Sequence, residues 1–439
     1  MRHSTAASGV KVGRPWVGVS VGIGVLAVRA AGAYDFMQPP PGLPADAVNT
    51  IQLYLADQVN YDDNLYRVPP GTVGVPLGAN ANDSQTDVVN STTFGSQGRW
   101  DIGRQEVDLD LRADENRFKR NTSLDYVSAN AVGTLNWHAA DAFSGQVRSY
   151  YDRSLASFSE TRFTGKDIIT SLEELGYGRY QVGPHWAVYG QVRGSYTNHS
   201  ATIAQFNDFH EKAGYVGAEY ATDVNDLFAL EYQYVDITFK PNVALAAGAY
   251  DYGENTEKFI VNYALSDKTS INAYVGSLQR KYPVSGVNSY AGGIWRVSFN
   301  WAATGKSNVG VSAWHELHAY VDAESNYFVA QGVSLAPTWT ATEKLSFILQ
   351  TSYEKENFIG NSGSEVTGLF VPGGVNGVAV VPVGVRVDKV NAEQLTLRYV
   401  PRDAWVVTVV ARHEKRESTQ YIFSFNDNVF SGSLTYRFL

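Results

Sequence analysis

The segment Ser433-Leu434-Thr435-Tyr436-Arg437-Phe438, close to the end of the chain, decides the fold. Its apolar side chains stand at every second position, and polar side chains fill the positions between them. Because successive side chains of a β-strand point to opposite faces of a sheet, this alternation predicts a strand with one apolar face and one polar face. Phe438 ends the pattern, and Leu439 follows it as the last residue.

The same two-residue period recurs in long segments throughout the chain. Strands of soluble proteins average about five or six residues, whereas these segments reach roughly twice that length, as a tilted strand needs in order to cross a bilayer. We therefore predict membrane-spanning strands, with a soluble all-β solenoid or sandwich as the alternative. An alternating last strand with an aromatic end is typical of substrates of the barrel-assembly machinery, which is an expected partner. The clearest alternating stretches are Val107–Arg112, Gly293–Trp301, Leu345–Gln350, Gln394–Tyr399 and Trp405–Arg412.

Short polar turns and longer irregular loops are predicted to alternate between these strands, an asymmetry typical of transmembrane β-barrels. The short turns are Ile102–Arg104, Ala139–Asp141, Gly183–Pro184, Asp223–Asn225, Ser266–Lys268, Ala303–Gly305, Thr340–Thr342 and Pro401–Arg402. The longer loops are Asp62–Asp87, Phe158–Lys166, Thr197–Asp208, Pro241–Glu254, Tyr282–Asn288, Phe358–Arg386 and Glu417–Asn428. With a first strand near Asn49–Tyr61 and a last near Asn428–Leu439, we predict an all-β, antiparallel up-and-down barrel of about eighteen strands, or sixteen, with short periplasmic turns and longer extracellular loops.

The composition excludes several other classes of protein. The chain has 27 Tyr, 20 Phe, 9 Trp and 40 Gly among 439 residues, which suits strands and interfacial aromatic girdles. It has no cysteine, so disulfides and metal–thiolate sites are impossible, and its net charge of −9 disfavours a nucleic-acid binder. Asp62-Asp63-Asn64 fits a site for calcium or for a cation that bridges lipid phosphates, and it also fits an acidic loop start, which is commoner. His315-Glu-Leu-His318 lacks the H-E-x-x-H spacing and lies in a predicted strand, so we expect no metal there. No nucleotide-binding loop, G-x-S-x-G motif or Ser/His/Asp set stands out, so we expect no cofactor and no enzyme activity.

The amino-terminal segment has the order of a secretory signal. Arg2, Lys11 and Arg14 precede the apolar run Trp16–Val28, and Ala31-Gly32-Ala33 supplies small residues for cleavage. A short membrane anchor is the alternative. We predict a signal peptide at 1–33, a Pro-rich leader at 34–48 and the barrel at 49–439.

If the apolar faces meet lipid, the polar faces line the lumen. Arginine and aspartate are interleaved there, a mixture that can hydrogen-bond a hydrated, charged polymer without holding it tightly, and the alternative is that they pair across strands and only stabilise the wall. The almost uncharged loop Phe358–Arg386 is expected either to fold inward as a constriction or pack on a partner, or to stand outside as a hairpin. The predicted pore-lining residues are Arg99, Asp108, Asp110, Arg112, Arg148, Asp152, Arg193, Arg296, Arg398 and Arg412.

Tyr61-Asp-Asp-Asn-Leu-Tyr-Arg-Val-Pro69 resembles the first-strand motif of the EpsL-type outer-membrane proteins, which accompany exosortase-linked exopolysaccharide biosynthesis clusters and fall within a β-barrel porin superfamily. The resemblance extends over about Tyr61–Phe158. Further segments similar to that family are Gly103–Gln105, Ser123–Tyr126, Leu135–Trp137, Ser144–Gly145 and Arg153–Phe158.

This resemblance implies a passive porin-like channel that exports an exopolysaccharide across the outer membrane of a Gram-negative bacterium. The expected partners are outer-membrane lipid and lipopolysaccharide, the polysaccharide itself and periplasmic export proteins. Three alternatives stay open: a general diffusion or solute-uptake porin, an outer-membrane barrel enzyme acting on lipid or polymer, and a structural barrel with a filled lumen.

Overall fold

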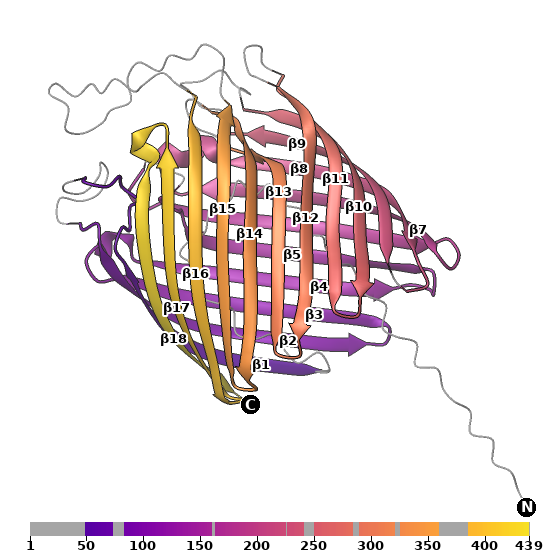
Figure 1. The fold of residues 1–439 in the computed structure, drawn as a ribbon, viewed down its shortest axis with the longest axis horizontal. Helices are drawn as coiled ribbons and strands as arrows, with labels where there is room; N and C mark the ends of the chain where they lie inside the picture. The colour runs from indigo at the N-terminus through magenta and orange to yellow at the C-terminus, as the bar shows by residue number, and fades with distance from the viewer. Residues whose placement is uncertain are drawn as a thin grey trace, which may run out of the picture.

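The computed structural model describes residues 49–72, 83–159, 163–224, 226–240, 250–283, 289–320, 325–359 and 385–438. These residues form one sheet of 18 strands, in which each strand pairs antiparallel with the next along the chain. The first and last strands also pair, with Leu53 opposite Phe438, so the sheet closes into a barrel (Figure 1). The closed antiparallel barrel and its strand number are as the sequence predicts.

The strands of the barrel are β1 (Thr50–Asp62), β2 (Asp87–Ile102), β3 (Gln105–Phe118), β4 (Tyr126–His138), β5 (Phe143–Leu155), β6 (Ile168–Gln181), β7 (Trp186–His199), β8 (Phe209–Ala221), β9 (Leu227–Phe239), β10 (Tyr252–Ser266), β11 (Thr269–Lys281), β12 (Tyr290–Thr304), β13 (Ser307–Ala319), β14 (Tyr327–Thr342), β15 (Leu345–Ile359), β16 (Val387–Arg402), β17 (Trp405–Ser418) and β18 (Phe425–Phe438). Among the described residues, three 3-10 helices lie in connections: η1 (Thr122–Leu124), η2 (Thr202–Asn207) and η3 (Tyr421–Phe423). In the part of the chain that the structure describes, no helix has the length and apolar character to cross a membrane.

Side chains alternate between the two faces of the barrel wall. On β1, Ile51, Leu55 and Val59 are exposed, whereas Tyr54 and Gln58 between them are buried. The same alternation gives the whole barrel an apolar outer surface, which is stable only against hydrocarbon. Exposed outer aromatics lie near the short turns (Phe143, Tyr180, Trp186, Trp301, Trp339, Tyr399, Trp405 and Phe438) and nearer the long connections (Tyr61, Tyr234, Trp295, Tyr353 and Phe430). An apolar band between two aromatic girdles is the outer surface of a barrel that sits in the bacterial outer membrane.

Short and long connections alternate along the chain, as predicted, but several boundaries differ. The turns after β12, β14 and β16 lie at 305–306, 343–344 and 403–404, one to three residues later than expected. Polar residues that look like turn signals, such as Thr340 and Arg402, are still paired in the ladder there. The connections at 119–125 and 320–326 escaped prediction because both carry buried apolar side chains, Leu124 and Tyr320 among them.

Other sequence predictions fall outside the described residues. These are the signal peptide and leader at 1–48 and nearly all of the apolar loop Phe358–Arg386, of which residues 360–384 are not described. The last strand begins at Phe425 rather than near Asn428, because Phe425 pairs with Arg416 of β17 and its side chain is buried inside the barrel.

The long-connection end of the barrel holds packed apolar clusters on its inner side. Leu65, Leu124 and Phe158, which lie in or next to three different connections, are buried against inner-face residues of β2 to β6. The described parts of these connections therefore pack on the inner side of the barrel at the end of the long connections. The inner face nearer the short turns carries charged side chains such as Arg99 and Asp108 together with buried apolar ones such as Val406.

The loop end of the β13–β14 hairpin leaves the wall and enters the barrel. Strands β12 and β13 pair only from Trp295 and His315 toward the short turn. Beyond that point Leu317 and Val329, which lie on the outward face of the hairpin, are buried in one cluster with Leu278 of the inner face of β11. The outer face of the hairpin thus packs against the inner face of β10–β12.

Candidate functional site: the inner wall of the barrel

All ten predicted pore-lining residues lie on the inner face of the wall. On β3, for example, Asp108, Asp110 and Arg112 alternate with Leu111, which is exposed on the outer face. Residues opposite each other in the register lie on the same face of the sheet. The register therefore places the other predicted pore-lining residues on the inner face too; they lie on β2, β5, β7, β12, β16 and β17. That they line an open path for solute remains a prediction.

Five of the seven arginines in this set form ion pairs. Arg99 Nε lies 2.7 Å from Asp108, its direct partner on the next strand. Arg296 Nη2 lies 2.7 Å from Glu316 on β13. The remaining pairs are Arg112–Asp114, Arg193–Glu211 and Arg412–Glu414. The wall-stabilising alternative therefore fits these five residues.

Arg148 and Arg398 differ from the other five arginines. Neither makes an ion pair with any residue that the structure describes, although the guanidinium of Arg148 lies 5.7 Å from the centre of the Tyr150 ring. Both side chains are half-buried on the inner face. An arginine without a carboxylate partner keeps its charge available to a solute, so these two are the strongest candidates for a role in selectivity.

Some charged side chains of the inner wall are exposed to water, whereas others are buried. Side chains of Arg99, Asp108 and Arg296 are 24%, 31% and 37% exposed, so water reaches them inside the closed barrel. By contrast, the side chains of Arg193 and Glu211 are 4% and 1% exposed. The buried pair has a structural role in the wall, whereas the exposed groups can meet a solute.

A second group of inner residues joins polar and charged groups to aromatic rings across β9–β15. Lys258 Nζ lies 3.0 Å from Gln233 Oε1 and 5.3 Å from the centre of the Tyr274 ring. Tyr274 donates a hydrogen bond to Glu316, the partner of Arg296. The guanidinium of Arg296 also lies 5.0 Å from the ring of Trp314, whose Nε1 donates to Glu354 at 2.6 Å.

The local sequence pattern does not reveal this group of inner residues. Glu257 and Lys258 are adjacent, so composition does not say which one faces inward; the register places Lys258 inside and Glu257 outside. Tyr274 and Trp314 lie on the inner face, although aromatic side chains are expected on the lipid face. The inward and outward alternation of the more regular neighbouring strands is the sequence signal that would have predicted their inward orientation.

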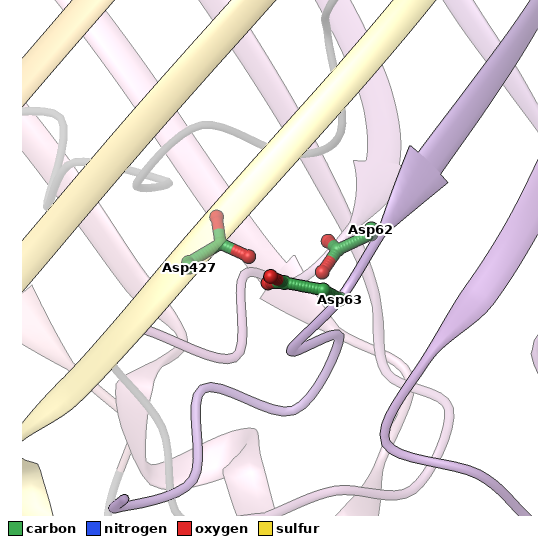
Figure 2. Close-up of side chains that lie close together, drawn as sticks. All are labelled: Asp62, Asp63 and Asp427. Carbon is green, nitrogen blue, oxygen red and sulfur yellow. The ribbon is translucent and has the colours of Figure 1, made fainter.

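Asp62, Asp63 and Asp427 approach one another where β1 meets β18 (Figure 2). Arg67 joins two of them, with Nη1 3.0 Å from Asp62 and Nη2 3.0 Å from Asp427. Asp63 accepts hydrogen bonds from the backbone and the side-chain nitrogens of Asn428, both at 2.7 Å. A guanidinium thus supplies the positive charge that a calcium ion would bring, and the cluster fastens the first long connection to the last strand.

The His315–His318 segment has the geometry that its strand parity predicts. His315 points outward and lies 2.9 Å from Gln331 Nε2, whereas His318 stacks on Phe328 inside the barrel. The two rings therefore cannot share one metal ion.

Comparisons with known proteins give structural likeness only. No model of a known protein family matches the chain, and no curated protein matches it. Similar solved structures include a BenF-like porin from Pseudomonas fluorescens Pf-5 (10% identity, TM-score 0.49, covering 89% of this chain and 100% of that one) and OccK2 (OpdF) of Pseudomonas aeruginosa (11%, 0.48, 89% and 99%). The siderophore receptor PirA from Pseudomonas aeruginosa is another (9%, 0.44, 89% and 81%).

Because these identities and TM-scores are low, the assignment of the fold rests on strand pairing and on the apolar outer face. The resemblance of Tyr61–Phe158 to EpsL-type proteins gains no support from the family models. The described residues form an 18-stranded outer-membrane β-barrel, and water reaches charged side chains of its inner wall.

Proposed function

We propose that the protein is a passive outer-membrane channel for small hydrophilic solutes. The observation that carries the proposal is the water exposure of charged inner-face side chains, such as Asp108 and Arg296, in a closed barrel. Inner side chains of a barrel with a filled lumen would be dry. A barrel of 16 to 18 strands is wide enough to leave an aqueous channel.

The chemistry of the inner wall supports solutes that offer several hydrogen-bonding groups. Acids and bases are interleaved, so no single sign of charge dominates the wall. Lys258, Arg296, Tyr274 and Trp314 combine hydrogen-bond donors with flat aromatic faces. Polyols, sugars and small organic acids have the matching groups, whereas strongly apolar solutes do not.

Export of an exopolysaccharide is the second candidate. The resemblance over Tyr61–Phe158 favours it, and aromatic rings also stack on the sugars of a polymer. The inward packing of Leu65, Leu124 and Phe158 at the mouth favours small solutes instead, because a hydrated polymer needs a wider exit. Size dependence of permeation therefore separates the two candidates.

The test is permeation through the purified protein in liposomes. Swelling rates are measured with a monosaccharide, a disaccharide and a tetrasaccharide, and protein-free liposomes serve as the control. The proposal expects the rate to fall steeply with size. An absence of both swelling and single-channel conductance would contradict a channel. Ready passage of the tetrasaccharide and of dextran would favour export of a polysaccharide over permeation of small solutes. A deletion strain that still secretes normal polymer would count against export.

A further inference from the structure

Two lysines face each other on the outer wall near the long connections. Lys355 of β15 and Lys389 of β16 are direct partners in the antiparallel register. Tyr353 and Leu395, which are exposed on the same outer face, lie nearer the short turns. Glu354 and Glu356, the neighbours of Lys355, point inward, and Glu356 is buried. Both lysines therefore point away from the lumen.

This lysine pair is unfavourable within the protein alone. Like charges directly opposite each other on one face of a sheet destabilise it. Neither lysine makes an ion pair with any described residue. Glu417, the register partner of Lys389 on β17, is held by Lys415 at 2.6 Å. Among the described residues, Glu417 attracts Lys389 but already pairs with Lys415, so the charge of Lys389 is only partly balanced.

The level of the pair matches the outer edge of the apolar band. The outer face of β16 is apolar near the short turn, where it presents Tyr399, Leu397 and Leu395. Toward the long connection the next outward residue is Glu393, and Lys389 lies four residues beyond Glu393. At about 3.3 Å per residue, Glu393 is roughly 13 Å from Lys389 along the strand and does not neutralise it. On β17 the same face changes from Val409 to His413 and Lys415. The lysines therefore lie at the polar headgroups, on the side of the long connections.

We propose that Lys355 and Lys389 bind a phosphate group of lipopolysaccharide in the outer leaflet. The long connections of an outer-membrane barrel face outward, so the headgroups at this level belong to that leaflet, whose phosphorylated glycolipid carries its phosphates at the edge of the hydrocarbon. A phosphate between the two ammonium groups satisfies both and turns their repulsion into a bridge. Clustered lysines next to a membrane-spanning segment are a usual means of binding anionic lipid.

The experiment measures binding of phosphorylated lipid A and of dephosphorylated lipid A to the full-length protein in detergent, by native mass spectrometry. The test variant is Lys355→Gln/Lys389→Gln. The matched control is Lys268→Gln/Lys306→Gln, which removes two exposed lysines from the short turns at the other end of the barrel. A third variant, Lys355→Arg/Lys389→Arg, keeps the charge. Heat-modified gel mobility shows that each variant is folded.

The wild-type protein, the control variant and the arginine variant should prefer the phosphorylated lipid. The test variant should bind it on the order of tenfold more weakly and bind the dephosphorylated lipid unchanged. The proposal is overturned if the wild type shows no preference for phosphate, if the test variant keeps the full preference, or if the control loses as much. Channel conductance is measured in parallel and should be the same in all variants, so failure of the proposed function is seen separately.

Discussion

Arg280 of β11 and Glu254 of β10 are register partners that form a fully buried ion pair inside the barrel. Nε and Nη2 of Arg280 lie 2.9 and 2.8 Å from the same carboxylate oxygen of Glu254. The guanidinium also lies 4.0 Å from the centre of the Tyr252 ring and 5.9 Å from that of Tyr327. Because Tyr327 belongs to the hairpin that enters the barrel, this pair joins the hairpin to the wall.

Breaking that pair should strongly destabilise the barrel. Glu254→Gln leaves the buried charge of Arg280 without its carboxylate, and removing one partner of a buried pair costs about 3–5 kcal/mol. Urea unfolding in detergent micelles measures the loss. The control is Glu115→Gln, which removes an exposed pair with Arg117 and should cost about 1 kcal/mol or less. Equal losses in the two variants would contradict this assignment.

Ion selectivity should depend on the two arginines that lack carboxylate partners. Arg148→Glu/Arg398→Glu reverses two inner-face charges, so the permeability ratio should shift several-fold toward cations. The reversal potential across a planar bilayer in a salt gradient measures the shift. Arg193→Glu is the informative comparison. Arg193 is buried beside Glu211, so this change should lower stability first. Unchanged reversal potentials in the double variant would show that Arg148 and Arg398 do not face the permeation path.

The seam between β1 and β18 should depend on Arg67 and not on calcium. Arg67→Met leaves Asp62 and Asp427 buried together and should cost about 3–5 kcal/mol. Chelation of calcium should leave the thermal unfolding midpoint of the wild type unchanged. Arg104→Met, which removes an exposed pair with Asp141, is the control. A large loss of stability on chelation would instead identify the acidic cluster as a metal site.

The first long connection should loosen at alkaline pH. Burial, and then the neighbouring Asp83, raise the pKa of Tyr66 above its ordinary value. The neutral phenol therefore contributes stability that is complete below about pH 10 and is lost progressively as the pH rises above that value. Tyr66→Phe should weaken this pH dependence, as followed by protease cleavage of the connection between pH 8 and 11, roughly. An identical pH profile in the variant would exclude Tyr66 as the titrating group.

The regular strands could be predicted from the sequence because their period of two is imposed by two different solvents. Leu109 and Leu111 must meet lipid and Asp110 must meet water, so sequence alone sets the face of each residue. Strand ends were less certain, since polar residues such as Thr340 occur both in turns and on the inner wall.

Two features of the interior could not be predicted in the same way. Leu317 and Val329 have the pattern of lipid-facing residues, yet they are buried inside the barrel. Apolar side chains suit hydrocarbon and a packed core equally well, so nothing local distinguishes the two. Likewise, the sequence shows Arg193 and Arg148 as similar inner cations. Glu211 lies diagonal to Arg193 in the register, and Glu173 lies diagonal to Arg148 in the same way. Only the side-chain contacts of the structure show that Arg193 pairs with Glu211, whereas Arg148 makes no ion pair with a described residue.

The central claim is that opposite faces of each strand meet water and hydrocarbon. The chain has no cysteine, so single introduced cysteines can be read without background. Val297→Cys and Ser298→Cys on β12, and Val409→Cys and Arg412→Cys on β17, are each exposed to a charged, membrane-impermeant thiol reagent in liposomes. We predict rapid labelling at positions 298 and 412 and protection at positions 297 and 409. Equal labelling of neighbouring positions, or protection of all four, would contradict a barrel with a water-accessible interior.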